Sequence, residues 1–517
     1  CPSRHMSESE TSSRKESGES GGTLKQSVAR TLKWNVIDRL SSQVLYLVTG
    51  VVLARELTQE EYGLVGAIQV FHVFASLFVD SGFAAVLLQR KSPTRLEYST
   101  VLWFNVAMSL AIYMLLYILA PVIADLFQGD VRLIPLSRVM FLTFIINAFS
   151  IVQVNRLTKL MDTRMVAVSN SLGLVAGAVV GIYLAVTGYG AWALVWQAIV
   201  ISVVKVAILW LTSGWTPLWR FSFESLRGFV RLGSGVTISS VLNTVFLTMG
   251  SFVIGHKVSL VTLGYYTQAD KWSKMGVTSL SQVFTSSFVP LLSGVQDDSE
   301  RYARMCGKTH RLAAYLLFPA MGLLAVMATP IFHTLFGTKW DPSIVLFQLL
   351  LMRGIFMVLS SLYGNFMLSL AKSKLLVLTE TVKDVTSVVA VIVTLPYIAM
   401  TSGGNVVYGV EIFLWGQLVA SVVTWLVTLV YVIRITGRPF MSYLADLAPY
   451  VAVTTLGSLP CALIAGAFEM LPPVLCCVEA IVFVAVYVGV NALLKSRIQA
   501  DVLGYLFGRF MKNKMAV

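Results

Sequence analysis

The chain alternates between long apolar runs and short polar connectors along most of its 517 residues. A run of about 20 apolar residues is long enough to cross the hydrocarbon core of a bilayer as a helix. No connector is long enough to hold a soluble domain. The alternation therefore predicts an all-α polytopic membrane protein that works inside the bilayer.

The composition agrees with this class and excludes others. Only 13% of the residues are charged, whereas a soluble domain typically has about 25%, and the mean hydropathy is +0.76. The net charge of +13 is spread over connectors beside apolar runs, where anionic lipid headgroups are the natural partners. We therefore expect contact with the lipid bilayer and none with nucleic acid.

The apolar runs predict about fourteen transmembrane helices, whose bounds are uncertain by several residues. The expected spans are 33–54, 64–88, 99–121, 133–154, 165–187, 191–212, 231–255, 264–290, 310–330, 342–366, 375–396, 406–433, 444–467 and 472–494.

Basic residues gather in every second connector, and basic loops stay in the cytoplasm. The poor set of connectors holds only Arg55, Arg132, Arg138, Lys257 and Lys339. The rich set includes Arg90, Lys91 and Arg95, and later Arg301, Arg304, Lys308 and Arg311. A regular alternation of this kind predicts an even number of spans with both termini in the cytoplasm.

The N-terminal tail and the absent motifs narrow the function. Residues 1–22 are rich in Ser, Glu and Gly and are expected to be disordered; the run Ser3–Met6 resembles a cloning scar. We expect no cleavable signal peptide. The five cysteines form no disulfide framework or zinc ligand set, and no ATP-binding loop, zinc-protease or nucleophile-elbow motif occurs. The chain is expected not to be an enzyme and to need no cofactor or metal.

A weak internal repeat divides the spans. Residues 53–63 align without gaps on residues 254–264, and in each a span ends, a short turn follows and a Gly opens the next span. Repeats that face each other across a central site are a common plan of transporters. The expected organisation is a tail over 1–22, an N-lobe over 23–220, a C-lobe over 221–440, two extra helices over 441–500 and a cytoplasmic tail over 501–517.

Polar residues form stripes on four expected spans. On the first span, Asn35, Arg39, Ser42, Tyr46 and Thr49 are spaced by four, three, four and three, which places them on one helix face. The other stripes are Gln69, His72, Ser76 and Asp80; Thr237, Ser240, Thr244, Thr248 and Ser251; and Gln268, Lys271, Met275, Thr278, Gln282 and Thr285. A polar face in lipid must meet protein or water, so the stripes predict either a shared wet cavity or hydrogen bonds between helices.

Ionisable residues deep in the spans are costly and therefore informative. Arg353 lies near the middle of its span, and Lys271, Lys274 and Lys205 also fall within spans. The alternatives are intramembrane ion pairs and snorkelling, the latter favoured for Lys205, Asp38 and Lys383. Deep cations without an equal density of acids favour an anionic ligand, and phosphate oxygens suit Arg and Lys.

By contrast, the stripe of Gly173, Gly177 and Gly181 predicts close helix packing.

Several segments resemble the Wzx-type polysaccharide flippases of the multidrug/oligosaccharidyl-lipid/polysaccharide exporter superfamily, over nearly all of residues 30–500. The segments are Leu57–Leu64, Asp80–Phe83, Gln89–Lys91, Gly264–Ala269, Phe288–Ser293 and Gln296–Asp298. The resemblance implies two six-helix lobes in a V around a cationic cavity, with two extra helices. It also implies a multi-pass protein of the bacterial inner membrane that flips undecaprenyl-pyrophosphate-linked oligosaccharides for surface polysaccharides such as the O-antigen of lipopolysaccharide.

On this hypothesis the oligosaccharide repeat unit crosses to the outer leaflet by alternating access, coupled to H⁺ or Na⁺, and other polysaccharide-assembly proteins are candidate partners. The expected headgroup-binding cations are Arg353, Lys271, Arg39, Lys274 and Lys205. The expected polar lining is Asn35, Gln69, His72, Asn243, Gln268 and Gln282. The candidates for ion coupling are Asp80, Glu380, Asp384 and Glu411.

Other functions stay open at this point, including a scramblase and a pure scaffold. A multidrug antiporter of the same superfamily would need an acid-dominated cavity, against which the deep Arg353 and Lys271 count. A membrane-embedded glycan polymerase or ligase usually carries a long outer loop, and the outer connectors here are short.

Overall fold

A computed structural model describes Trp34, Arg90, Gly504 and residues 37–80, 86–87, 92–468 and 470–502. It describes their side chains except those of residues 78–80, 228, 230–240, 242–243 and 246. Within this part of the chain the regular elements are helices, and the β-pairing found there is an isolated bridge between Ser402 and Asn405. The predicted all-α fold is confirmed.

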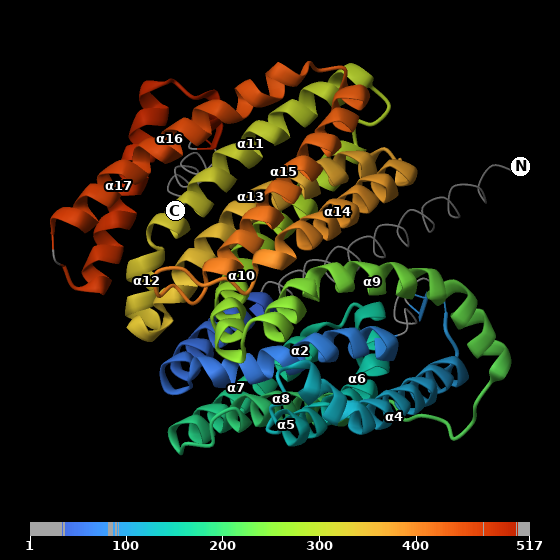
Figure 1. The fold of residues 1–517 in the computed structure, drawn as a ribbon. Helices are drawn as coiled ribbons and strands as arrows, with labels where there is room; N and C mark the ends of the chain where they lie inside the picture. Colours follow the sequence, from blue (N-terminus) through green and yellow to red (C-terminus); the bar gives the residue numbers. More distant parts are fainter. Residues whose placement is uncertain are drawn as a thin grey trace, which may run out of the picture. The chain divides into compact units, whose positions relative to one another are not determined.

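The chain forms two compact units, Cys1–Phe252 and Val253–Val517. The first, unit 1, contains the helix Ile37–Glu56 and most of α9 at its end. Between these lie α2 (Gln59–Asp80), α4 (Arg95–Leu126), α5 (Leu133–Met140), α6 (Leu142–Lys159), α7 (Arg164–Val186) and α8 (Trp192–Thr212), followed by α9 (Phe223–Lys257) (Figure 1). The predicted lobe boundaries at residues 220 and 440 stay a prediction.

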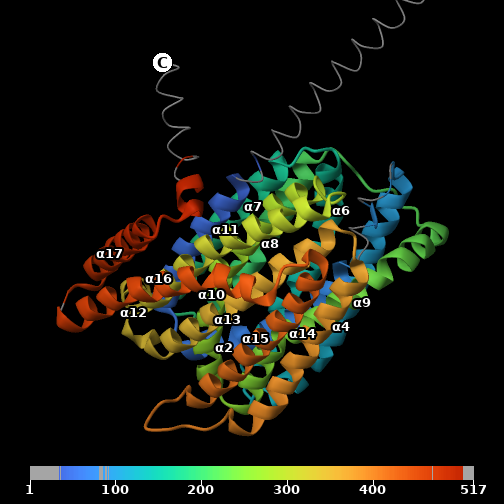
Figure 2. The same ribbon diagram turned by 90° about the horizontal axis from the view of Figure 1, so that it is seen from above.

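The second unit, unit 2, begins within the last turn and a half of α9. Its helices are α10 (Leu260–Ser293), α11 (Ser299–Val326), α12 (Ala328–Leu335), α13 (Asp341–Ser369), α14 (Ser373–Thr394), α15 (Tyr408–Thr436), α16 (Phe440–Ala467) and α17 (Pro472–Leu493). Short 3-10 turns precede α13 and follow α14. Figure 2 shows α16 and α17 running side by side at one edge of this unit, where α16 also packs on α11 and α17 on α12.

Ten helices of the described part are long and apolar enough to span a membrane. The predicted spans 64–88, 231–255, 264–290 and 375–396 correspond to α2, α9, α10 and α14, which are helical but absent from those ten. The structure therefore confirms a multi-pass helical protein and leaves the count of fourteen spans a prediction. α10 carries Asp270, Lys271 and Lys274 in its first half and many Ser and Thr residues in its second half, which lower its apolar character.

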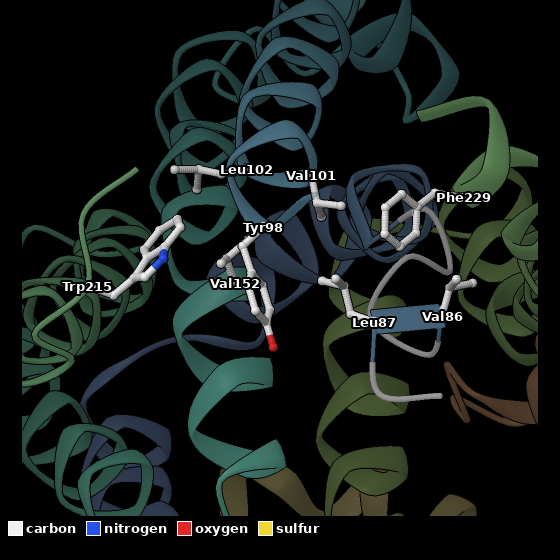
Figure 3. Packing of buried hydrophobic residues seen from close by; sticks show 8 residues of the cluster. All are labelled: Val86, Leu87, Tyr98, Val101, Leu102, Val152, Trp215 and Phe229. Atoms are coloured by element: carbon white, nitrogen blue, oxygen red, sulfur yellow. The ribbon is translucent and has the colours of Figure 1, made fainter. Parts of the chain in front are cut away.

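A buried aromatic cluster fastens the connector between α8 and α9 to the start of α4. Trp215 of the connector packs edge-to-face on Tyr98 at 6.3 Å between ring centroids. Val152 of α6 and Phe229 of α9 belong to the same cluster, with Phe229 at the far side beside Val86 and Leu87 (Figure 3). The indole N–H of Trp103 donates to the carbonyl of Leu218 at 2.9 Å. This end of unit 1 is therefore tied together through side chains from four segments.

The glycine stripe of α7 packs directly against α8, as the sequence predicts. A Cβ added at Gly177 would lie 2.3 Å from Cγ1 of Ile201 and 2.9 Å from the carbonyl oxygen of Gln197. Neither distance allows a side chain without a shift of the neighbouring helix. The small residues therefore set how closely these two helices approach.

Candidate functional site

A cavity of about 400 Å³ in unit 2 is lined by α10, α13, α14 and α15. Hydroxyl and amide side chains supply most of its polar groups. They are Thr278, Ser281, Ser360, Ser361, Asn365, Thr379, Ser421, Thr424 and Thr428. Several bond to one another or to neighbours: Asn365 donates to Thr285 at 3.0 Å, and Thr386 and Thr424 share a bond of 2.9 Å. Such a surface offers many neutral donors and acceptors.

Glu380 and Lys383, both on α14, form an ion pair at the edge of this cavity. Asp384 follows on the same helix, and its Oδ1 is buried without a hydrogen-bond partner. Two of the four acids predicted for ion coupling, Glu380 and Asp384, therefore lie on one helix, one of them facing a hydroxyl-lined cavity. A buried carboxylate oxygen without a partner is costly and marks a place where a proton or cation would be stabilising.

The predicted cations of unit 2 lie on α10 and α13, which pack tightly: a Cβ at Gly354 would lie 2.3 Å from Val277. Lys271 is exposed, and its Nζ lies 5.1 Å from the centroid of the Trp272 ring. Lys274 pairs with Asp270 at 2.6 Å. Arg353 is half-buried and its Nε has no hydrogen-bond partner. None of these cations lines the cavity described above.

The two glutamines of α10 differ in their surroundings. Gln268 is fully buried and neither amide atom has a hydrogen-bond partner, whereas Gln282 is exposed. A buried amide with both atoms unpaired is unusual, which makes Gln268 the more informative of the pair.

In unit 1 the predicted residues have separate surroundings. Arg39 and Gln69 are exposed, on the helix Ile37–Glu56 and on α2. Lys205 is half-buried on α8, where its Cβ lies 3.6 Å from the Cβ position that Gly173 of α7 lacks. The three residues lie on three different helices of unit 1.

His72 of α2 is held by packing. Its Nε2 lies 2.9 Å from Oγ1 of Thr143 on α6, and its ring stacks on Phe144 at 4.6 Å between centroids. Both contacts are those of a satisfied interior side chain.

The remaining predicted residues are peripheral or lie outside the described residues. Glu411, in the first turn of α15, accepts a hydrogen bond of 2.8 Å from Asn405 in the preceding connector. Asn35 lies outside the described residues, as do the side chains of Asp80 and Asn243. Their assignments stay predictions.

Two acids have environments that the sequence reading did not anticipate. Asp38, expected to snorkel, accepts a bond of 3.3 Å from Asn170 of α7, and its Oδ1 is buried with no hydrogen-bond partner among the described residues. Glu479 of α17 is 1% exposed, and its Oε2 likewise has no hydrogen-bond partner in the described part of the chain. A single acid inside the long apolar run 472–494 was the available signal for Glu479.

The described residues hold no group of three or more His, Cys, Asp and Glu close enough to bind a metal ion.

Comparison with known proteins places the chain in a family. The model of a polysaccharide biosynthesis protein family matches residues 52–345, which is more than half of the chain. The succinoglycan biosynthesis transport protein ExoT of Rhizobium meliloti (strain 1021) is 25% identical over 61% of this chain and 64% of its own length. The lipopolysaccharide biosynthesis protein WzxC of Escherichia coli (strain K12) is 23% identical over 82% and 85%.

Solved structures share the fold. The Lipid II flippase MurJ in an inward closed conformation has a TM-score of 0.71 at 14% identity, covering 91% of this chain and 100% of its own. An inward-facing multidrug resistance MATE family transporter of the MOP superfamily has a TM-score of 0.57 at 15% identity, covering 78% and 99%. Transport and flipping, not catalysis, are what these names describe, which agrees with the prediction that the chain is not an enzyme. The resemblance stated from the sequence is confirmed, and the chain belongs to the polysaccharide biosynthesis protein family.

Proposed function

We propose that this protein is a flippase for polyprenyl-pyrophosphate-linked oligosaccharides in the bacterial inner membrane. The supporting observation is that a polysaccharide biosynthesis family match coincides with the fold of a Lipid II flippase. A lipid-linked sugar carries a diphosphate, many hydroxyls and an apolar tail. A helical protein that offers cations, hydroxyls and lipid-facing helices suits all three parts.

The diphosphate would be attracted by Lys271 and Arg353, with Arg39, Lys274 and Lys205 as further contributors. Arg353 suits this role because its Nε is buried and has no hydrogen-bond partner among the described residues, so a phosphate oxygen that reached it would satisfy a donor left unpaired. Lys274 is a weaker candidate because Asp270 already neutralises it. Several moderate cations also allow release on the far side.

Ion coupling is assigned first to Glu380 and Asp384 of α14, with Asp80 and Glu411 as further candidates. The cavity beside Glu380 provides hydroxyl oxygens that a proton or Na⁺ would find favourable. Glu411 is the least suited of the described acids, since its carboxylate at the start of α15 already accepts a hydrogen bond from Asn405 of the preceding connector.

The decisive experiment reconstitutes the purified full-length chain in liposomes with a fluorescent undecaprenyl-pyrophosphate oligosaccharide. We expect flipping to depend on the protein and to accelerate with an inward H⁺ or Na⁺ gradient. Gradient-driven efflux of a cationic dye without flipping would favour the multidrug antiporter instead. Absence of both activities in folded protein would contradict the proposal.

The cations are tested separately in cells that need this protein for surface polymer. Arg353→Gln combined with Lys271→Gln should reduce polymer export at least tenfold at normal protein levels. Lys372→Gln combined with Lys374→Gln removes two exposed charges at the start of α14 in the same unit and should have no effect. Normal export by the first double variant would remove these two cations from the mechanism while leaving flipping itself intact.

A further inference from the structure

A second pocket of unit 2, about 440 Å³, opens between α11, α16, the end of α17 and the segment that follows it. Its polar lining is rich in cations and lies at one end of these helices. The charged and polar residues that matter are Lys308, Arg311, Tyr450, Asn491, Arg497 and Asp501. None of them was assigned a role above.

This pocket has a surplus of positive charge. Lys308 pairs with Asp501 at 3.0 Å. Arg311 lies 3.3 Å from Asp446, but Asp446 is shared with Arg438 at 2.9 Å. The exposed Arg497 forms no ion pair with any described residue. An anion placed here would meet the guanidinium of Arg497, which pairs with no described acid. It would also meet that of Arg311, whose partner Asp446 is shared with Arg438.

An apolar groove of about 270 Å³ lies further along α11 and α17. α11 supplies Leu316, Pro319, Ala320 and Leu323, and α17 supplies Phe483 and Val484. Arg311 of the cationic pocket and Leu323 at the far end of the groove are twelve positions apart on α11, which is a rise of about 18 Å along a helix. That length is close to half of the roughly 30 Å hydrocarbon core, so the pocket and the groove together span about one leaflet.

Three tyrosines join the cationic pocket to the apolar groove. Tyr450 lines the pocket, and Tyr315 and Tyr487 line the groove. Tyr315 lies 5.7 Å from Tyr450 and 5.6 Å from Tyr487 between ring centroids, and the Tyr487 hydroxyl donates to the Tyr315 carbonyl at 2.9 Å. All three tyrosines are buried, so they pack α11, α16 and α17 together between the pocket and the groove.

We propose that this pocket and groove bind an anionic phospholipid, its phosphate beside Lys308, Arg311 and Arg497 and one acyl chain along α11 and α17. The cationic pocket and the apolar groove next to it together span about one leaflet, so they match a phospholipid in both charge and length. The bound lipid would hold α17 against α11. The site uses none of the residues assigned to flipping, so it stands independently of the proposed function.

The test measures lipid binding to the full-length chain in neutral detergent by native mass spectrometry. Dioleoyl phosphatidylglycerol should bind tighter than dioleoyl phosphatidylcholine. Arg497→Gln breaks no ion pair and should weaken phosphatidylglycerol binding roughly fivefold, and Lys308→Gln added to it should weaken binding by a further factor of about five. Ala320→Trp, which fills the groove, should weaken both lipids.

The controls separate the site from general attraction. Lys372→Gln combined with Lys374→Gln should leave phosphatidylglycerol binding unchanged, and sn-glycerol 1-phosphate, which lacks acyl chains, should not bind. Equal binding of the two phospholipids, or an Arg497→Gln variant that binds phosphatidylglycerol like the unmodified chain, would overturn the proposal. So would displacement of phosphatidylglycerol by equimolar undecaprenyl phosphate, which would assign the groove to a polyprenyl tail. A variant is compared only if its melting temperature without lipid matches that of the unmodified chain.

Discussion

Asp130, in the connector between α4 and α5, is the centre of a charged cluster outside the spans. The side chain of Arg132 donates to both carboxylate oxygens, at 3.0 Å from Nε to Oδ1 and 2.6 Å from Nη2 to Oδ2. The backbone N–H of Arg132 adds a bond of 2.9 Å, and Arg132 also pairs with Glu60 of α2. The Arg132 guanidinium holds the pKa of Asp130 below its usual value, against the opposing effect of burial.

This shift gives stability a defined pH dependence. A carboxylate whose pKa is lowered by folding stabilises the fold fully above its unfolded pKa, about 4, and loses that contribution as pH falls through the lower folded value. Asp130→Asn should therefore cost about 0.5–1 kcal/mol at pH 7, and the difference should shrink as the pH falls below 4. Thermal denaturation in detergent from pH 7 to pH 3 measures it, with the exposed Asp297→Asn as control. A cost at pH 3 equal to that at pH 7 would contradict the assignment.

Single residues show how far sequence reading reaches. The sequence predicted that Lys271, Lys274 and Arg353 lie on helices, because charge within an apolar run is visible at once. It did not predict the contacts between helices, such as that of His72 with Thr143, because these join residues that are far apart along the chain. Burial of one acid in an apolar run, as for Glu479, likewise depends on packing from other helices.

The starts of helices and the close packing of helix pairs were easier to predict than single side-chain contacts, because caps and stripes of small residues are local in sequence. The repeat of 53–63 in 254–264 recurs as a shared helix start. The Thr58 hydroxyl accepts from the N–H of Glu61 at 3.3 Å before α2, and the Ser259 hydroxyl accepts from the N–H of Thr262 at 3.0 Å before α10. Both are N-caps. The aligned residues Thr58 and Ser259 thus each cap the N-terminus of a helix, one in each unit.

The close contact of α7 with α8 leads to a sharp stability prediction. Gly177→Ala would place a methyl group 2.9 Å from the backbone carbonyl of Gln197, which cannot move without its helix. We expect a loss of about 1–3 kcal/mol through overpacking, seen as a lower melting temperature in detergent. Gly489→Ala on α17, where an added Cβ meets nothing within 4 Å, is the matched control and should be neutral or slightly stabilising. Equal melting temperatures for Gly177→Ala and the unmodified chain would show that the glycine does not limit the contact.

At the scale of the whole molecule, hydropathy alone predicted the fold class, because a bilayer admits few backbone solutions. Hydropathy does not by itself give the number of spans, because α2, α9, α10 and α14 carry more polar sequence than a span that faces lipid on all sides. Polarity of this kind is expected of helices that face protein or water. The hydroxyl-lined cavity of unit 2 could not be foreseen because its lining comes from four helices, of which the sequence reading marked α10 alone as a polar stripe.

The orientation rests on the charge of the connectors and can be tested at the two ends of one helix. α13 lies between Lys339, in a connector expected outside, and Lys372, in a connector expected in the cytoplasm. In a background that carries Cys1→Ser, Cys476→Ser and Cys477→Ser, the remaining cysteines are the buried Cys306 and Cys461, and Lys339→Cys should react with a membrane-impermeant maleimide in intact cells. Lys372→Cys should react only after the inner membrane is made permeable, because basic connectors are retained inside. The reverse pattern would invert the whole topology and place both termini outside. Reaction at both sites in intact cells would show instead that α13 does not cross the membrane, and the even count of spans would fail with it.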